Sequence, residues 1–182
     1  MKTAPRLVLS ALLLVGAGYA LAKEPPLAVV SAVDLKRYSG MWYEVARLPN
    51  RFQQQCMADV TADYQLRDDG RLSVTNACRL ADGSIDRAEG EARIASDQGS
   101  NAKLEVRFAP AWLGWLPLVW GDYWIIELAP DYSYSVVGTQ SRKYFWVLAR
   151  NPSLDEAALT AILLRASKRG FDTTAIVRTL HQ

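Results

Sequence analysis

The sequence of 182 residues is poor in the side chains from which most active sites are built. Its one histidine, His181, lies next to the C-terminal residue, where chains commonly fray. A Ser–His or Cys–His nucleophile would therefore have its base in the least ordered part of the chain. The chain has only two cysteines, and no cluster of His, Cys and carboxylate residues has the pattern of a metal site. This composition disfavours histidine-based catalysis and a metal centre, and nothing in it indicates a cofactor.

The N-terminal segment has no acidic residue and resembles an export signal. Lys2 and Arg6 precede an apolar run that ends in an A-x-A cleavage site at residues 20–22. The apolar run of about 16 residues is shorter than the roughly 20 that a membrane-spanning helix needs. We therefore expect residues 1–22 to be a cleaved signal peptide and residues 23–182 to form one exported, periplasmic domain. Because no Cys follows the cleavage site, the acceptor for a lipid anchor is missing there.

The expected mature chain also lacks an excess of charge of either sign. Without Lys2 and Arg6, the 21 basic residues become 19, which equals the 19 acidic residues. A nucleic-acid partner would select a basic face that binds its phosphates. The charge balance therefore argues against nucleic-acid binding.

Between Gly40 and Thr139 the chain alternates apolar and polar residues in short segments that are separated by turn sequences. "DVTADYQL" (59–66), the turn at Asp68–Gly70 and "RLSVTNAC" (71–78) form a predicted hairpin. The same pattern predicts six further strands, of which the first begins at the "GMWYEV" segment and the others span 89–94, 102–108, 122–128, 134–139 and 143–150. Closing such a meander removes its two open edges, which predicts an all-β, eight-stranded up-and-down antiparallel barrel. An open β-sandwich is the alternative.

One helix follows the predicted strands. Ser153 and Glu156 have the spacing of a capping box, apolar residues recur at helical spacing after them, and Gly170 ends the run. We expect this helix to pack outside the barrel, on the outer surface near Phe145 and Val147. The tail at 175–180 could add one more strand edge.

Three segments resemble the conserved motifs of the lipocalin family. They are "GMWYEVARLPNRF" (40–52), "GDYWIIEL" (121–128) and "WVLARNPSLDE" (146–156). Within that family, their sequences most resemble those of the bacterial outer-membrane (Blc-like), apolipoprotein D-like and temperature-induced plant lipocalins. The resemblance implies that Trp42 fills the closed floor of the barrel and that Arg150 stacks across it. Gly40 would then leave space where the chain enters the floor.

Strand alternation predicts which side chains face the barrel interior. The inward set is mostly apolar, as in a pocket for a fatty molecule: Tyr64, Leu72, Val74, Asn76, Leu104, Val106, Phe108, Trp124, Ile126, Tyr144 and Trp146. Of these, we expect all but Leu72 and Ile126 to contact the ligand; the alternative is that the set packs only against itself. Glu44 also points inward by parity from Trp42, and we interpret it as a buried polar contact.

The two cysteines, Cys56 and Cys78, are expected to form a disulfide because the chain is exported. A hairpin turning at Asp69–Gly70 does not place them directly opposite each other. The bridge therefore requires Cys56 to lie in the loop before its strand and to fold across it.

The segment "APAWLGWLPLVWG" (109–121) has no charged residue and contains Trp112, Trp115 and Trp120. Tryptophan is favoured at membrane interfaces, so this loop could contact a membrane. It could equally fold inward as a lid over the ligand, and a homodimer contact is a third interpretation.

Together these features predict an exported protein that binds a fatty acid or lysophospholipid, and stores or transports it for maintenance of the cell envelope, with some association with the outer membrane. The rival interpretation is a lipocalin-fold enzyme acting on a lipid or isoprenoid through Glu44, Tyr64 or Tyr144. A third is a structural envelope protein whose barrel is filled by its own side chains.

Overall fold

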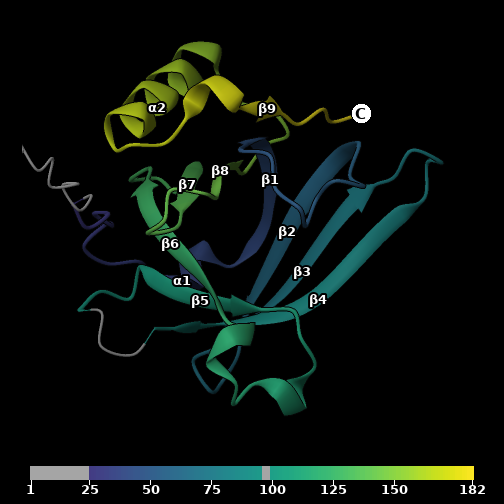
Figure 1. The fold of residues 1–182 in the computed structure, drawn as a ribbon, viewed down its shortest axis with the longest axis vertical. Helices are drawn as coiled ribbons and strands as arrows, with labels where there is room; N and C mark the ends of the chain where they lie inside the picture. Colours follow the sequence, from purple (N-terminus) through teal and green to yellow (C-terminus); the bar gives the residue numbers. More distant parts are fainter. Residues whose placement is uncertain (1–24, 96–98) are drawn as a thin grey trace, which may run out of the picture.

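Eight strands follow one another as an antiparallel meander in the computed structural model, which describes residues 25–95 and 99–182 (Figure 1). The strands are β1 (Gly40–Arg47), β2 (Ala58–Leu66), β3 (Leu72–Arg79), β4 (Ile85–Ile94), β5 (Lys103–Arg107), β6 (Gly121–Leu128), β7 (Tyr134–Gly138) and β8 (Phe145–Ala149). The barrel closes because β1 pairs with both β2 and β8. The predicted eight-stranded barrel is therefore confirmed. The predicted signal peptide, residues 1–22, lies outside the described residues.

The hairpin of β2 and β3 has nearly the expected register, with Tyr64 opposite Val74 and Leu66 opposite Leu72. Buried and partly buried residues alternate along most of β2, because one face of the strand lines the barrel interior. A register shift lies between Ala58 and Thr61, where β2 approaches the open end of the barrel.

A short helix, α1 (Leu35–Tyr38), and the start of β1 close one end of the barrel. Trp42 is fully buried, and its indole Nε1 donates a hydrogen bond to the carbonyl of Tyr38 at 2.8 Å. The guanidinium of Arg150 lies 3.8 Å from the centroid of the Trp42 ring. Gly40 has a φ of +93°, a left-handed conformation that residues with a Cβ rarely adopt. This turn brings β1 into the barrel directly beneath Arg150.

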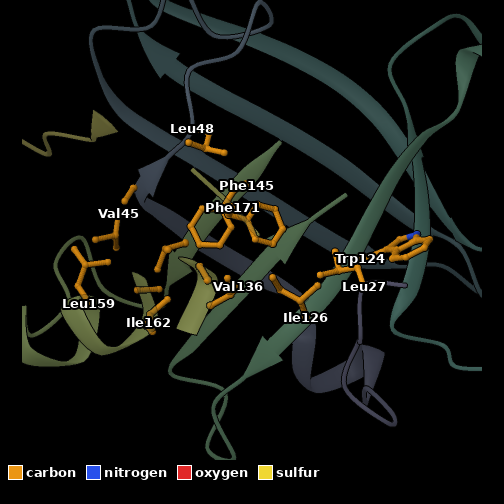
Figure 2. Packing of buried hydrophobic residues seen from close by; sticks show 14 residues of the cluster. Leu27, Val45, Leu48, Trp124, Ile126, Val136, Phe145, Leu159, Ile162 and Phe171 are labelled. Carbon is orange, nitrogen blue, oxygen red and sulfur yellow. The ribbon is translucent and has the colours of Figure 1, made fainter. Parts of the chain in front are cut away.

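The main helix, α2 (Glu156–Lys168), packs on the outside of the barrel (Figure 1). Its buried Leu159 and Ile162 join an apolar cluster that includes Phe145 and Val147 of β8, as expected (Figure 2). The prediction that a capping box at Ser153 begins this helix was wrong. The N-cap is Asp155, whose carboxylate accepts the backbone N–H of Ala158 at 3.0 Å, because it stands immediately before the first helical residue.

The C-terminal tail forms part of the barrel wall. The short strand β9 (Val177–Arg178) pairs with β1, in line with the strand edge expected there. The next residues bridge β1 and β2: Thr179 N–H donates to the carbonyl of Val45, and Asp59 N–H donates to the carbonyl of Leu180. The side chain of His181 is only 8% exposed, and its Nε2 lies 2.8 Å from the carbonyl oxygen of Glu44. The expectation that His181 lies in a frayed end was therefore wrong.

Among the described residues, three short 3-10 helices complete the elements: η1 (Ala111–Leu113), η2 (Pro117–Val119) and η3 (Thr173–Ala175). The first two lie in the long loop between β5 and β6, which extends away from the barrel (Figure 1). Within the described part of the chain, no helix has the length and apolar character needed to cross a membrane.

Candidate ligand cavity

A cavity of about 710 Å³ occupies the barrel between its closed end and the loops at the other end. This volume is typical of sites that hold a small molecule, for which about 300–1,000 Å³ is usual. The cavity exists because small residues occupy inward positions of the wall, among them Ala62 on β2, Ala88 on β4 and Gly121 on β6. Gly90, two residues after Ala88 on β4, allows a close approach of the neighbouring strand, since a Cβ there would lie 2.4 Å from the carbonyl oxygen of Arg107.

Most of the predicted wall residues do line the cavity. They are Tyr64, Val74, Asn76, Val106, Phe108, Tyr144 and Trp146. Leu72 and Leu104 also point inward, but each is only 1% exposed and packs in the inner apolar cluster with Tyr38 and Trp42. These two leucines belong to the floor beneath the cavity, where they do not reach the open space.

The predicted orientation of Trp124 and Ile126 was wrong. Both belong to the outer cluster, where Trp124 lies close to Leu27 of the N-terminal segment (Figure 2). The Nζ atom of Lys103 lies 4.5 Å from the centroid of the Trp124 ring. The inward residues of β6 are instead Tyr123 and Ile125. Four consecutive apolar residues at 123–126 leave the strand without alternation, so the sequence pattern does not fix which side faces inward.

Tyr123 belongs to a buried chain of hydroxyl groups that the sequence did not reveal. Its hydroxyl lies 2.9 Å from those of Tyr38 and Tyr64, and the Tyr38 hydroxyl lies 3.0 Å from that of Ser135. Burial raises the pKa of Tyr38 to about 12, and it also raises the pKa values of Tyr64 and Tyr123. The three phenols are therefore neutral at physiological pH, and they satisfy one another at the base of the cavity. Because β6 lacks alternation, its sequence carries no signal that identifies Tyr123 as an inward residue.

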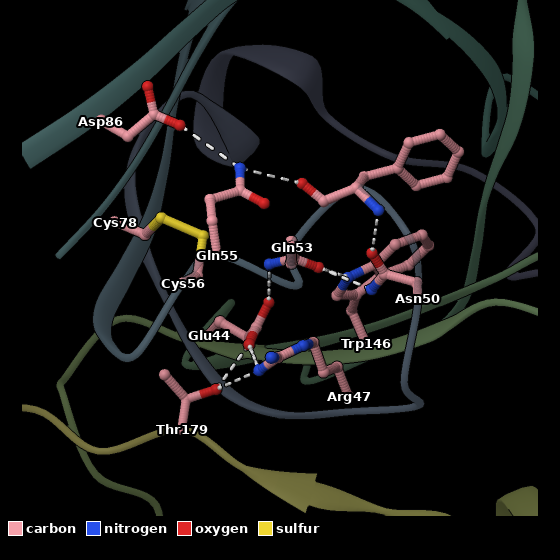
Figure 3. Close-up of a disulfide and its surroundings, with 11 residues drawn as sticks. Glu44, Arg47, Asn50, Gln53, Gln55, Cys56, Cys78, Asp86, Trp146 and Thr179 are labelled. Atoms are coloured by element: carbon pink, nitrogen blue, oxygen red, sulfur yellow. Dashed lines mark hydrogen bonds and ion pairs between the residues drawn. A yellow bond between two sulfur atoms is a disulfide. The ribbon is translucent and has the colours of Figure 1, made fainter. Parts of the chain in front are cut away.

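Glu44 is the buried carboxylate of the cavity wall (Figure 3). One carboxylate oxygen accepts from Nη1 of Arg47 at 2.9 Å and from the hydroxyl of Thr179. The other accepts from Nε2 of Gln53 at 2.6 Å, and the Gln53 oxygen accepts from the indole of Trp146 at 2.9 Å. This network connects the C-terminal tail, the cavity wall and the loop at 48–57, and both oxygens of Glu44 are occupied.

The predicted disulfide joins Cys56 and Cys78, whose Cα atoms are 5.5 Å apart (Figure 3). Cys56 lies in the loop before β2, and the backbone N–H of Met57 donates to the carbonyl of Arg79 at 2.8 Å. The loop thus folds across the end of β3, as the bridge required. Both cysteines line the cavity, so the disulfide fixes one side of its wall.

The comparisons with known proteins agree with this architecture. Residues 33–181 match the family model described as a lipocalin-like domain. The chain belongs to the lipocalin family. This lipocalin is 35% identical to temperature-induced lipocalin-1 of Arabidopsis thaliana over 83% of the chain and 81% of the relative. It is 35% identical to outer membrane lipoprotein Blc of Escherichia coli K12 (84% and 83%) and 32% identical to apolipoprotein D of Rattus norvegicus (88% and 84%).

Solved structures show the same fold. Insecticyanin from Manduca sexta superposes on this lipocalin with a TM-score of 0.65 and 20% sequence identity, over 85% of this chain and 84% of that chain. Lobster apocrustacyanin A1 has a TM-score of 0.63 and 16% identity, over 88% and 94%. Membership of this family supports binding of a small hydrophobic ligand, because lipocalins are generally binding proteins rather than enzymes.

The loop between β5 and β6 separates its three tryptophans into two groups. The ring of Trp120 stacks under the guanidinium of Arg93 at 3.9 Å, and its Nε1 donates to the carbonyl of Gly114 at 2.8 Å. Trp112 and Trp115 are 73% and 77% exposed, and neither lines the cavity. Trp120 thus lines the cavity and anchors the loop, whereas the other two tryptophans face solvent.

Arg107 holds the base of this loop. Its Nη1 donates to the carbonyls of Ala109 and Pro110, and its Nη2 lies 2.6 Å from the carboxylate of Glu91.

Within residues 25–95 and 99–182, no group of three His, Cys, Asp or Glu residues is placed to hold a metal ion.

Proposed function

We propose that this lipocalin is exported and binds a fatty acid or a lysophospholipid, which it stores or carries in the cell envelope. The observation that supports this proposal is the cavity of about 710 Å³, closed at one end by Trp42 and lined mainly by apolar and aromatic side chains. A long acyl chain matches such a wall, because each buried methylene contributes about 0.8 kcal/mol. A chain of about 16 carbons gives about 12 kcal/mol, and association costs of several kcal/mol leave an affinity near micromolar.

The proposal is tested with the purified, delipidated protein and two probes, palmitic acid and a lysophosphatidylcholine. Isothermal titration should give saturation at one ligand per chain with a Kd near micromolar. Trp146→Ala removes part of the cavity wall and should weaken binding of either lipid about tenfold or more.

Trp124→Ala is the matched control, because it removes the same side chain from the outer cluster. It should lower the melting temperature and leave the Kd unchanged. If neither lipid binds the folded wild-type protein, the proposal fails. If both variants change the Kd equally, the cavity is not where the lipid lies.

We also propose that the loop between β5 and β6 inserts into a lipid surface. Trp112, Trp115 and Leu118 are all more than two-thirds exposed, and the last also lines the cavity. Tryptophan gains most at the boundary between lipid headgroups and acyl chains, where its ring is buried and its N–H stays hydrated. A contact at this loop would place the membrane next to the cavity and would shorten the transfer path of a lipid.

Flotation with phosphatidylethanolamine/phosphatidylglycerol vesicles tests the membrane contact. Trp112→Ser combined with Trp115→Ser should abolish co-flotation, whereas Leu164→Ser, which changes a 59% exposed leucine on α2, should not. Equal flotation of all three proteins would contradict the contact. Sedimentation of the same proteins decides the homodimer alternative, because a dimer built on this loop would dissociate in the double variant only.

The envelope location rests on the export signal expected at residues 1–22 and on the bacterial relatives, which are named outer membrane lipoproteins. This chain has no Cys after residue 22 at the expected cleavage site, so we propose a protein without a covalent lipid anchor. Expression in a Gram-negative host, followed by osmotic shock, should release a chain whose N-terminal residue is Lys23. Retention in the cytoplasm with Met1 intact would contradict export.

A further inference from the structure

Asn76 is the polar residue of the cavity wall whose hydrogen bonding is incomplete. Its side-chain oxygen Oδ1 is buried, and in the part of the chain that the structure describes it has no hydrogen-bond partner. Two other buried atoms share this condition, the Nε atoms of Arg47 and Arg107, but each of those guanidinium groups forms an ion pair through another nitrogen. A buried polar group without a partner is rare in native proteins, and its presence at a binding cavity indicates a missing partner.

The surroundings of Asn76 leave room for that partner. In the sheet, Asn76 lies opposite Ala62 on β2 and opposite Ala88 on β4, and all three residues line the cavity. The two alanines have no polar side-chain atom, so they offer the amide no hydrogen bond. Val74 precedes Asn76 on the inward face of β3, towards the floor, and Cys78 follows it towards the open end. Any ligand that reaches the deep part of the cavity along β3 therefore passes the amide.

The other deep polar groups are already occupied. The hydroxyl of Tyr64 donates to that of Tyr123, and the carboxylate of Glu44 is held by Arg47 and Gln53. Apart from its buried oxygen, Asn76 is partly exposed on the cavity wall, so a plain alkyl chain beside it would exclude water from the rest of the amide and offer it no hydrogen bond, which is unfavourable. An oxygen function at the same place would pair with it, since an amide both donates and accepts and can turn to present either group.

We infer that the ligand carries an oxygen function, a hydroxyl or a carbonyl, on the part of its chain that lies beside Asn76. This inference rests on the proposed function, and it narrows the ligand class from plain acyl chains to oxygenated ones. Asn76 is then a specificity-determining residue. It selects the ligand by a penalty on chains that lack the oxygen, which is the way a buried polar group discriminates most strongly.

The test compares stearic acid with hydroxystearic acids whose hydroxyl lies near the carboxylate, in the middle of the chain or near the methyl end. A further probe is a lysophosphatidylcholine with a stearoyl chain, whose oxygen functions lie in the headgroup region and not along the acyl chain. For the wild-type protein, one of the oxygenated probes should bind about tenfold more tightly than stearic acid, the ratio typical of one hydrogen bond to an otherwise unpaired buried group.

Asn76→Leu, which keeps a similar volume, should reduce this ratio to about one, mainly by strengthening the binding of stearic acid. Thr75→Val, on the neighbouring outward position of β3, should keep the wild-type ratio. Asn76→Ala serves as a second variant should the leucine disturb folding, and thermal melting checks both. In the ligand-free state Asn76→Leu should melt no lower than the wild type, because it removes an unpaired buried oxygen.

Two results would overturn the inference. One is a wild-type protein that binds every oxygenated probe no better than stearic acid. The other is an oxygenated-to-plain ratio that survives Asn76→Leu unchanged. Both differ from failure of the proposed function, in which the wild-type protein would bind none of the acyl chains.

Discussion

Arg150 binds the backbone of the segment that closes the barrel, residues 37–41. Replacing Arg150 tests how much these contacts stabilise the closed end. The Nη1 atom of Arg150 donates to the carbonyl of Met41 at 2.8 Å, and its Nη2 donates to the carbonyls of Arg37, Tyr38 and Ser39 at 2.7, 3.0 and 3.0 Å. The same guanidinium lies over the ring of Trp42 at 3.8 Å. We predict that Arg150→Met destabilises the protein while leaving the cavity wall intact, since Arg150 does not line the cavity.

The magnitude follows from these contacts. A desolvated cation over an indole contributes about 1–2 kcal/mol. The hydrogen bonds to backbone carbonyls contribute about 1–2 kcal/mol together. This is less than their number suggests, because Arg150 is partly exposed and water can bind the same carbonyls when the guanidinium is removed. The expected loss is therefore about 3 kcal/mol, which lowers the melting temperature by roughly 6–12 °C in a domain of this size.

Urea denaturation and thermal melting of three variants measure this effect. Arg150→Lys keeps the charge but loses the planar fork, so it should recover less than half of the stability. Arg87→Met removes an exposed arginine from β4 and should cost less than about 0.5 kcal/mol. If Arg150→Met is as stable as Arg87→Met, the contacts across Trp42 do not hold the floor. Full recovery in Arg150→Lys would instead show that charge alone suffices.

Three further predictions concern the wall and the helix. Cys56→Ser should lower the free energy of unfolding by about 3 kcal/mol, a loss that reduction of the wild-type protein should reproduce. Gly90→Ala should lower the melting temperature because its Cβ would meet the carbonyl of Arg107 at 2.4 Å; an unchanged melting temperature would contradict this close approach. Burial acts to raise the pKa of Glu127, but its bonds to Arg165 outweigh burial and lower that pKa below its ordinary value. The stability that the Glu127 carboxylate contributes is present above the ordinary carboxylate pKa and is lost as pH falls through the lowered pKa of Glu127. Urea denaturation at pH 7 should therefore show Glu127→Gln to be less stable than the wild type. The difference in unfolding free energy between the two proteins should shrink with acidification.

Several features of the fold could be predicted because they rest on local signals. Turn sequences such as Asp68–Gly70 separate segments of clear alternation, which gives the number and order of the strands. Where one face of a strand meets the interior and the other meets solvent, as in β2, parity also gives the inward residues, including Tyr64. The disulfide between Cys56 and Cys78 was expected from the presence of two cysteines in a chain with an export signal, although the hairpin register alone does not place them opposite each other.

The failures have a common cause, which is burial that the local sequence does not record. Both faces of β6 are apolar, because Tyr123 faces the interior while Trp124 is covered by the outer cluster. Alternation therefore disappears from β6. The long loop between β5 and β6 also prevents the inward positions of β6 from being counted onward from those of β5. His181 was misplaced for a similar reason, since the backbone partners that order the tail come from β1 and β2, more than a hundred residues earlier.

The sequence by itself determined an eight-stranded barrel with an outer helix and a largely apolar interior, since alternation and turn signals act over a few residues. The position of Trp42 at the floor was implied by the resemblance of the three motifs to lipocalins. Only the tertiary structure decided which face of β6 looks inward, that the tail fills the gap between β1 and β2, and that the amide of Asn76 stays unpaired beside two alanines. These outcomes depend on which distant residues come into contact, and short-range periodicity carries no record of such partners.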